Sequence, residues 1–176
     1  LQLDDLVPIH RIDRETAGLV IFSHHKASRG AYQRLFKDKT ITKTYEALAP
    51  TRADLNFPLH YQSRMVEGEP FFRMKEVAGE ANAETYISVL ANHGDVSLYQ
   101  LRPITGKKHQ LRVHLAALGI PIINDEFYPY LQPTKGDDFS HPLKLLAKSV
   151  AFVDPLTGQP RYFESSRSLS LDYGLV

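Results

Sequence analysis

Apolar and polar residues alternate along several short stretches of the chain, a pattern typical of β-strands with one buried face. A short run of aliphatic and aromatic residues at 19–22 indicates one further, buried strand. Turn-forming residues separate the stretches, most clearly at 92–95 and 154–158. The alternating stretches predict strands over 41–49, 71–77, 83–90, 96–101, 143–153 and 161–164.

Two segments instead repeat apolar residues at helical spacing, and they predict helices over 28–37 and 105–118. Thr105 is a suitable N-cap for the second helix, and Gly119 stands where a C-terminal cap belongs. The apolar stripe of that helix consists of Leu111, Leu115 and Leu118. A polar stretch rich in Pro and Gly, 124–141, predicts a long loop.

Many strands with few helices predict the α+β class. We expect a mixed, mostly antiparallel, curved β-sheet flanked by a few helices and long loops. The 176 residues are enough for one domain with a real core, and neither a repeat nor a long linker divides them. We therefore expect a single domain over 1–176. Because the first residue is Leu1, we expect a fragment that lacks its N-terminal segment.

The composition is that of an ordinary globular protein, with 43% hydrophobic and 23% charged residues. The chain has no cysteine, which excludes disulfides, thiolate catalysis and cysteine-based zinc sites. It contains neither an apolar run of membrane-spanning length nor a visible signal peptide. We expect a cytoplasmic monomer without a membrane partner.

Charge is segregated along the chain although the net charge is only +1. Residues 26–43 include six basic residues and one acid, and residues 102–114 include four basic residues and no acid. Residues 67–84 hold five acids and two basic residues. This separation suits a protein that turns one face toward phosphates, although blocks of charge are more often solvated surface.

The stretch HRIDRETAGLVIF at 10–22 places Asp13 between Arg11 and Arg14, just before the apolar run. The polar cluster therefore lies in a loop at the start of a rigid element, where catalytic groups are often found. Taken alone, a carboxylate between two arginines is more often a solvated turn with weak ion pairs.

A second cluster, RPITGKKHQLRVHLAALGIPIINDEFY at 102–128, places Lys107 and Lys108 at the start of the predicted second helix. A phosphate bound there would offset the unfavourable position of two cations at a helix N-terminus. Arg112 lies near the border of the buried face, and if buried it needs a carboxylate partner. Asp13 is the candidate, and the nearby cation would lower the pKa of Asp13 and keep it ionised. The two neighbouring histidines, His109 and His114, are more often structural in such a place.

Three motifs together resemble the RluA-type pseudouridine synthases. The first is similar to HRLDxxTSGLLL, the second to GRTHQIRVHLAxxGxPIxGDxxY, and 43–47 (KTYEA) to KxYxA. The resemblance implies that Asp13 is catalytic, that Arg112 pairs with it, and that Tyr45 stacks on the target base and assists proton transfer. It also implies RNA contacts from Arg11, Arg14, Lys43, Lys107, Lys108 and His109, with Arg11 filling the space that the flipped uridine leaves.

The chain departs from the family pattern at several places. Residues 16–18 read TAG in place of TSG, and Lys107 and Lys108 replace Arg-Thr, which keeps the charge but loses a planar fork. Asn124 and Asp125 replace the frequent Gly-Asp. The KPxG segment that precedes the first motif and the small N-terminal RNA-binding domain of many members are absent from this sequence.

The implied reaction breaks the bond between uracil N1 and ribose C1′, turns the base and rejoins it through C5, after the uridine has been flipped out. Asp13 either attacks C1′ or removes the C2′ proton, and the sequence leaves both routes open. Neither route requires a cofactor or a metal. The expected partner is RNA, with ribosomal RNA favoured over transfer RNA.

Other classes of function fit the residues less well. A non-catalytic RNA-binding module of the same fold is the strongest alternative, because it would keep the basic surface without needing Asp13. A retaining glycosidase would need a second carboxylate, for which Asp125 and Glu126 are candidates. A helical metal site is disfavoured because His109 and His114 are five residues apart.

Overall fold

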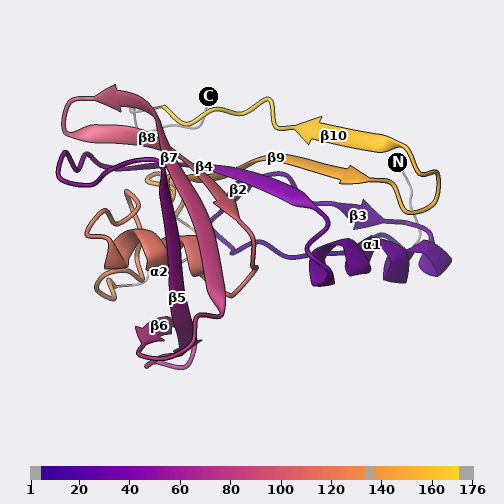
Figure 1. Cartoon of the computed structure of the whole chain (residues 1–176), viewed down its shortest axis with the longest axis horizontal. Helices are drawn as coiled ribbons and strands as arrows, with labels where there is room; N and C mark the ends of the chain where they lie inside the picture. Colours follow the sequence, from indigo (N-terminus) through magenta and orange to yellow (C-terminus); the bar gives the residue numbers. More distant parts are fainter. Residues whose placement is uncertain (1–4, 134–135, 137, 171–176) are drawn as a thin grey trace.

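The fold is an open, mostly antiparallel sheet with two α-helices, seen in a computed structural model (Figure 1) that describes residues 5–133, 136 and 138–170. The helices are α1, Arg29–Lys37, preceded by a 3₁₀ turn at Lys26–Ser28, and α2, Gln110–Ala117. The strands are β1 Val7–Pro8, β2 Ala17–Gly18, β3 Phe22–Ser23, β4 Thr42–Pro50, β5 Leu59–Glu67, β6 Met74–Val77, β7 Ala83–His93, β8 Val96–Pro103, β9 Leu145–Val153 and β10 Pro160–Glu164.

The main sheet has the strand order β10-β9-β4-β8-β7-β5-β6, and every neighbouring pair on this path is antiparallel. The short β2 pairs with β9 in parallel, which makes the sheet mixed. The pairing register shifts beside Leu90 in β7 and Lys148 in β9, and such bulges bend a strand and increase its twist. The predicted α+β class and mostly antiparallel sheet are confirmed.

Two hydrophobic clusters anchor the two helices to the sheet. Leu111 and Leu115 of α2 pack on Ile87, Tyr99 and Leu101 of the central strands. A second cluster joins α1 to β9 and consists of Leu35, Ile41, Val150 and Phe152. Figure 1 shows α1 and α2 at opposite ends of the sheet, with the N-terminal segment running between them. The space between the helices is where the candidate site lies.

Three strand predictions differ from the structure. The run 19–22 is not one buried strand: β2 ends at Gly18, β3 begins at Phe22, and Phe22 is half exposed. Gly18 explains the break, because its φ of +107° turns the chain and its backbone lies against Ala147 too closely for a side chain. Of the predicted strand 71–77, only the last four residues form a strand, β6. β5 was not predicted, since part of it was assigned to a loop at 50–60.

The second helix begins later than predicted. Its N-cap is His109, in a left-handed conformation with φ of +54°, and Thr105 does not cap the helix. Instead the side chain of Gln110 folds the preceding segment into a loop, because its Oε1 accepts hydrogen bonds from Thr105 Oγ1 at 2.6 Å and Lys107 N at 3.0 Å. Lys107 therefore lies in a loop before the helix. The C-terminal cap at Gly119 is confirmed by its φ of +75°.

Candidate active site

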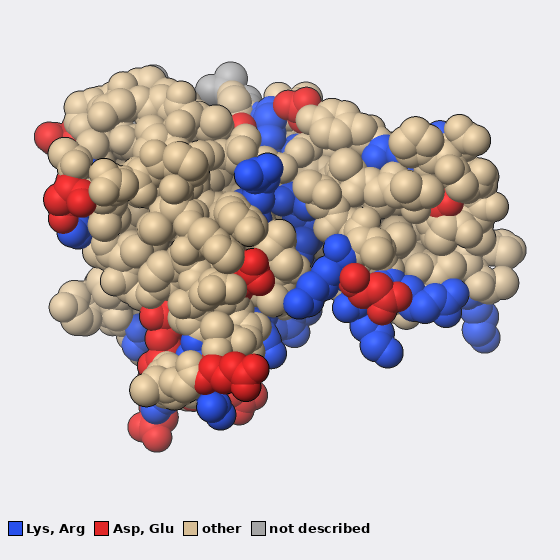
Figure 2. All heavy atoms as spheres, viewed as in Figure 1, with Lys and Arg blue, Asp and Glu red and all other residues tan. Residues whose placement is uncertain are grey.

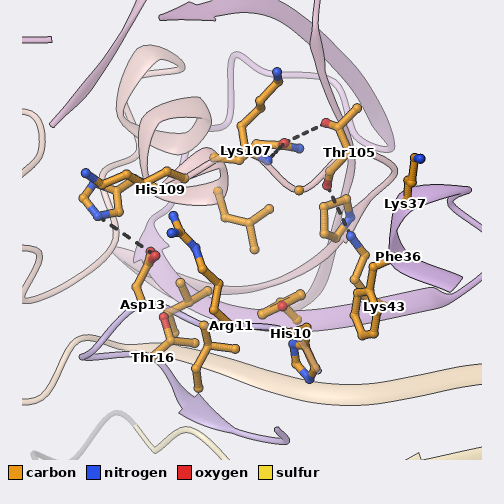
Figure 3. A pocket seen from close by; sticks show the side chains of 18 residues that line it. His10, Arg11, Asp13, Thr16, Phe36, Lys37, Lys43, Thr105, Lys107 and His109 are labelled. Carbon is orange, nitrogen blue, oxygen red and sulfur yellow. Dashed lines mark hydrogen bonds and ion pairs between the residues drawn. The ribbon is translucent and has the colours of Figure 1, made fainter. Parts of the chain in front are cut away.

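A pocket of about 380 Å³ lies between the two helices (Figure 3). Its wall on one side comes from the loop around Asp13, and on the other from the end of α1 at Lys37. Strand β4 contributes Lys43 and Tyr45, and the loop before α2 contributes 105–109. The pocket thus brings together all three motifs that the sequence analysis singled out.

Asp13 lies in a loop whose C-terminal end is fixed to the sheet. Its carbonyl accepts a hydrogen bond from Thr16 N at 3.0 Å, and β2 follows at once, paired with β9. Asp13 Oδ2 is 3.9 Å from Arg112 Nη1, and Oδ1 is 4.0 Å from His109 Nε2. Among the described residues, none donates a hydrogen bond to this carboxylate, so its oxygens are available to a substrate.

The pKa of Asp13 differs in direction from the sequence-based expectation. Burial raises the pKa of Asp13, and the opposing effects of Arg112 and Arg11 do not cancel it. Arg112 does lower the pKa of Asp13 as expected, but burial outweighs this effect, so the expected net lowering is wrong. A carboxylate that is desolvated and only loosely paired is a stronger base and nucleophile than one in a tight ion pair.

Arg112 is fully buried, not at the border of the buried face, and its main partner is Asp125 rather than Asp13. Its Nε and Nη2 donate to the two oxygens of Asp125 at 2.8 Å and 2.6 Å, a bidentate arrangement. Nη2 also donates to Glu15 Oε2 at 3.4 Å. Only Nη1 faces Asp13, so Asp125 fixes the guanidinium while Asp13 stays at a distance.

His109 is held in one tautomer by Tyr128. The hydroxyl oxygen of Tyr128 accepts a hydrogen bond from Met74 N at 2.7 Å and lies 2.9 Å from His109 Nδ1. A buried hydroxyl proton needs an acceptor, so we assign it to His109 Nδ1, which places the ring proton on Nε2, the nitrogen that faces Asp13. Burial and the charge of Arg112 lower the pKa of His109 to about 4, so the ring is neutral at pH 7.

Tyr45 and Lys43 enter the pocket from β4, beside the register shift at Lys148. Burial, and after it the charge of Asp13, raise the pKa of Tyr45 to about 12. The phenol therefore stays protonated at neutral pH, so it can stack and donate a hydrogen bond but does not accept a proton. Lys43 Nζ donates to the carbonyl of Thr105 at 3.3 Å, and burial lowers the pKa of Lys43 to about 8.

The remaining predicted RNA contacts divide into two groups. Arg11, Lys107 and Lys108 line the pocket, together with His109 and Lys43. Arg14 points elsewhere: its Nη2 donates to the carbonyl of Gly136 at 2.8 Å and its guanidinium lies over the ring of Phe139 at 5.8 Å. It contacts the loop predicted over 124–141, of which residues 134, 135 and 137 lie outside the described residues. The roles of all these residues stay predictions.

The charge segregation of the sequence becomes a spatial one. Figure 2 shows Lys and Arg side chains gathered in the hollow between the body of the sheet and the end that carries α1 and β10. Acidic side chains instead gather at the end where β5 and β6 lie. A cationic hollow with a carboxylate inside it suits a substrate that carries phosphates around a reacting centre.

The residues that hold the site side chains in place through hydrogen bonds were not predicted from the sequence. Asp125 entered as part of a motif and as a candidate second carboxylate of a glycosidase, but not as the partner of Arg112. Tyr128 was given no role, and Gln110 was not considered. The available signal was that Arg112, if buried, needs a carboxylate partner, and Asp125 was one of the carboxylates in the same motif. No group of three or more His, Asp or Glu side chains suited to a metal ion occurs in the described part of the chain, and none of its helices is long and apolar enough to cross a membrane.

Comparisons with known proteins identify the class. The family model described as RNA pseudouridylate synthase matches residues 1–117. The chain belongs to this family. Its members are isomerases that need no cofactor, and the chain is accordingly an RNA pseudouridine synthase.

Individual relatives agree with this assignment. The dual-specificity RNA pseudouridine synthase RluA of Pasteurella multocida is 34% identical over 158 residues, which cover 85% of this chain and 68% of that protein. Its counterpart in Haemophilus influenzae is 33% identical over 164 residues, covering 90% and 72%. Among solved structures, human RNA pseudouridylate synthase domain containing 1 shares the fold, with a TM-score of 0.75 at 24% identity over 91% of this chain and 68% of that one.

Proposed function

We propose that Asp13 is the reacting carboxylate of this pseudouridine synthase and that the target uridine enters the pocket flipped out of its RNA. The observation that carries the proposal is a carboxylate that is buried, free of hydrogen bonds from the described residues, and surrounded by cations. The glycosidic bond of a uridine stacked in RNA is out of reach of such a group, so the base has to leave the stack first.

The neighbouring residues divide the remaining tasks. Arg112, fixed by Asp125, keeps one guanidinium nitrogen 3.9 Å from Asp13 and stabilises the ionised form of Asp13 when substrate fills the pocket. Tyr45 stacks on the uracil ring, and neutral His109 presents its Nε2 proton to a carbonyl oxygen of the base or to Asp13. Arg11, Lys107 and Lys108 contact the backbone.

Asp13 can act by either of two routes. It can attack C1′ and release uracil as the leaving group, or it can remove the C2′ proton while the base leaves, which gives a glycal. Both routes need an ionised Asp13 and end with a new bond from C1′ to C5 and loss of the hydrogen on C5. Both therefore predict that Asp13→Asn abolishes the reaction.

We propose ribosomal RNA as the main substrate and transfer RNA as a second one. The words dual specificity in the names of the relatives support testing both. The test maps pseudouridine in total RNA from cells that lack the gene, using carbodiimide-dependent stops of reverse transcription. The cells are complemented with the wild type, with Asp13→Asn, or with Asp95→Asn, an exposed turn residue that serves as the matched control.

The expected result is a site that disappears on deletion and returns with the wild type and Asp95→Asn but not with Asp13→Asn. Full restoration by Asp13→Asn would refute the role of Asp13. It would favour the non-catalytic RNA-binding module, the alternative that keeps the cationic hollow and does without the carboxylate.

A further inference from the structure

A second hollow of about 260 Å³ adjoins the active-site pocket. Lys43 and Pro103 line both hollows, so the two share a wall. The other lining residues include Lys39 from the turn between α1 and β4, Tyr86 of β7 and Arg102 of β8. Figure 3 shows Lys43 on the side of the pocket opposite Asp13, so the second hollow lies beyond the end of the pocket that is remote from the reacting carboxylate.

The charges around this second hollow have one sign. Lys39, Lys43 and Arg102 contribute three cations, and no Asp or Glu lines it. Glu84, two residues before Tyr86 on the same strand, does not line the hollow, and its Oε1 lies 2.8 Å from His60 Nε2. A ligand with regularly spaced negative charges is therefore favoured over an apolar or cationic one.

An exposed aromatic ring completes the second hollow. Tyr86 pairs across the sheet with His60 of β5 on one side and with Arg102 of β8 on the other. One face of its ring stacks on His60, with centroids 4.2 Å apart and planes 6° from parallel, which holds the ring in a fixed orientation. Its residue remains 38% exposed.

Arg102 makes only a loose contact with the ring of Tyr86. The guanidinium carbon lies 5.9 Å from the centroid of the ring, at the outer limit of about 6 Å for a cation–π contact. Such a contact at an exposed site is weak, and Arg102 has a long, flexible side chain. A nucleobase can take the ring face while the guanidinium moves onto the base or its phosphate.

We propose that this second hollow binds a nucleotide that flanks the target uridine in single-stranded RNA, with its base on Tyr86 and its phosphate against Lys39, Lys43 and Arg102. Lys43 then connects the two hollows, because it contacts the backbone between the flipped uridine and its neighbour. The inference rests on the proposed function for the identity of the ligand as RNA. It adds a base-stacking site outside the catalytic pocket.

The test measures binding of a fluorescein-labelled, single-stranded oligouridine by fluorescence anisotropy, with Asp13→Asn as background so that the probe is not converted. Removing a stacked base partner weakens single-strand binding by roughly 5- to 150-fold, so this is the loss expected for Tyr86→Ala. Tyr86→Phe keeps the ring and should bind within about twofold of the background protein. Tyr162→Ala, which removes an exposed tyrosine from edge strand β10, is the matched control and should bind unchanged.

The second variant is Arg102→Gln. Arg102 is exposed, so we do not expect the substitution to disturb the fold. It should reduce the slope of log Kd against log salt concentration by about one, the effect of losing one phosphate contact. The proposal would be overturned if Tyr86→Ala bound oligouridine as tightly as the background protein and Arg102→Gln kept the same salt slope. It would also be overturned if Tyr162→Ala lost as much affinity as Tyr86→Ala. A failure of the proposed function is recognised separately, as an absence of pseudouridine formation by the protein with Asp13 intact while these binding differences persist.

Discussion

The buried pair of Arg112 and Asp125 gives the sharpest prediction about stability. Asp125→Asn removes the charge that compensates a fully buried guanidinium and turns one acceptor oxygen into an amide donor. The backbone N–H groups of Phe127 and Tyr128, which donate to Asp125 Oδ1 at 2.8 Å and 3.0 Å, keep an acceptor in asparagine. Breaking a buried ion pair from one side costs about 3–5 kcal/mol.

We expect the lower end of that range, because Glu15 at 3.4 Å and Asp13 at 3.9 Å still compensate Arg112 in part. For a chain of this size, a loss of about 3 kcal/mol lowers Tm by roughly 6–12 °C. Differential scanning calorimetry and urea unfolding measure both quantities. Asp54→Asn is the matched control, since Asp54 also accepts a bidentate pair of hydrogen bonds from an arginine, at 2.6 Å each, but on the surface.

The control should unfold at the wild-type temperature, because exposed ion pairs contribute little. The reasoning about Asp125 would be refuted if Asp125→Asn and Asp54→Asn shifted Tm by the same small amount. A double variant, Arg112→Met with Asp125→Asn, should recover part of the lost stability because the buried guanidinium is then gone. The recovery should be incomplete, since Asp13 and Glu15 lose their cationic neighbour.

Four further predictions concern protonation and backbone geometry. Because the pKa of His109 is lowered to about 4, ¹⁵N NMR should show its imidazole titrating near that pH, with the neutral ring protonated on Nε2. The free energy of unfolding should fall as pH decreases from about 6.5 to about 4, since only the unfolded state takes up a proton on this histidine in that range. Tyr128→Phe should lose that fixed tautomer, seen in the same spectra. RNA affinity should decline as pH rises through about 8, where Lys43 loses its charge, and Lys43→Arg should remove this dependence in anisotropy titrations. Gly18→Ala should destabilise the fold in urea unfolding, because φ is +107° and a Cβ would overlap the carbonyl of Ala147.

Much of the fold followed from the sequence because the long strands alternate and the helices have clear apolar stripes. β4, β7, β8 and β9 were predicted within a few residues of their observed ends. The start of α2 was not, because the Gln110 side chain, rather than a serine or threonine cap, organises the preceding loop through contacts with Thr105 and Lys107. β5 escaped prediction although its burial alternates, because the polar Ser63 stands among the inward positions Leu59, Tyr61 and Met65 and its first two residues were assigned to a loop.

The sequence predicted which residues belong to the candidate site but not how their side chains pair. The motifs pointed to Asp13, Tyr45 and Arg112: Asp13 and Tyr45 line one pocket, and Arg112 is buried beside Asp13. Which carboxylate holds Arg112 depends on how the 124–141 loop packs against α2, a long-range contact that spacing does not encode. The net direction of the Asp13 pKa likewise depends on burial, which outweighs the charge of its neighbours and becomes known only with the fold.

The most direct test of the central claim is release of tritium from RNA labelled at uridine C5, because rejoining the base through C5 expels that hydrogen. Purified wild-type protein and Asp13→Asn are compared on the same labelled ribosomal and transfer RNA, with binding measured in parallel. The account predicts tritium release by the wild type, and binding without release by Asp13→Asn. Equal release by both proteins would contradict the assignment of Asp13 as the reacting carboxylate.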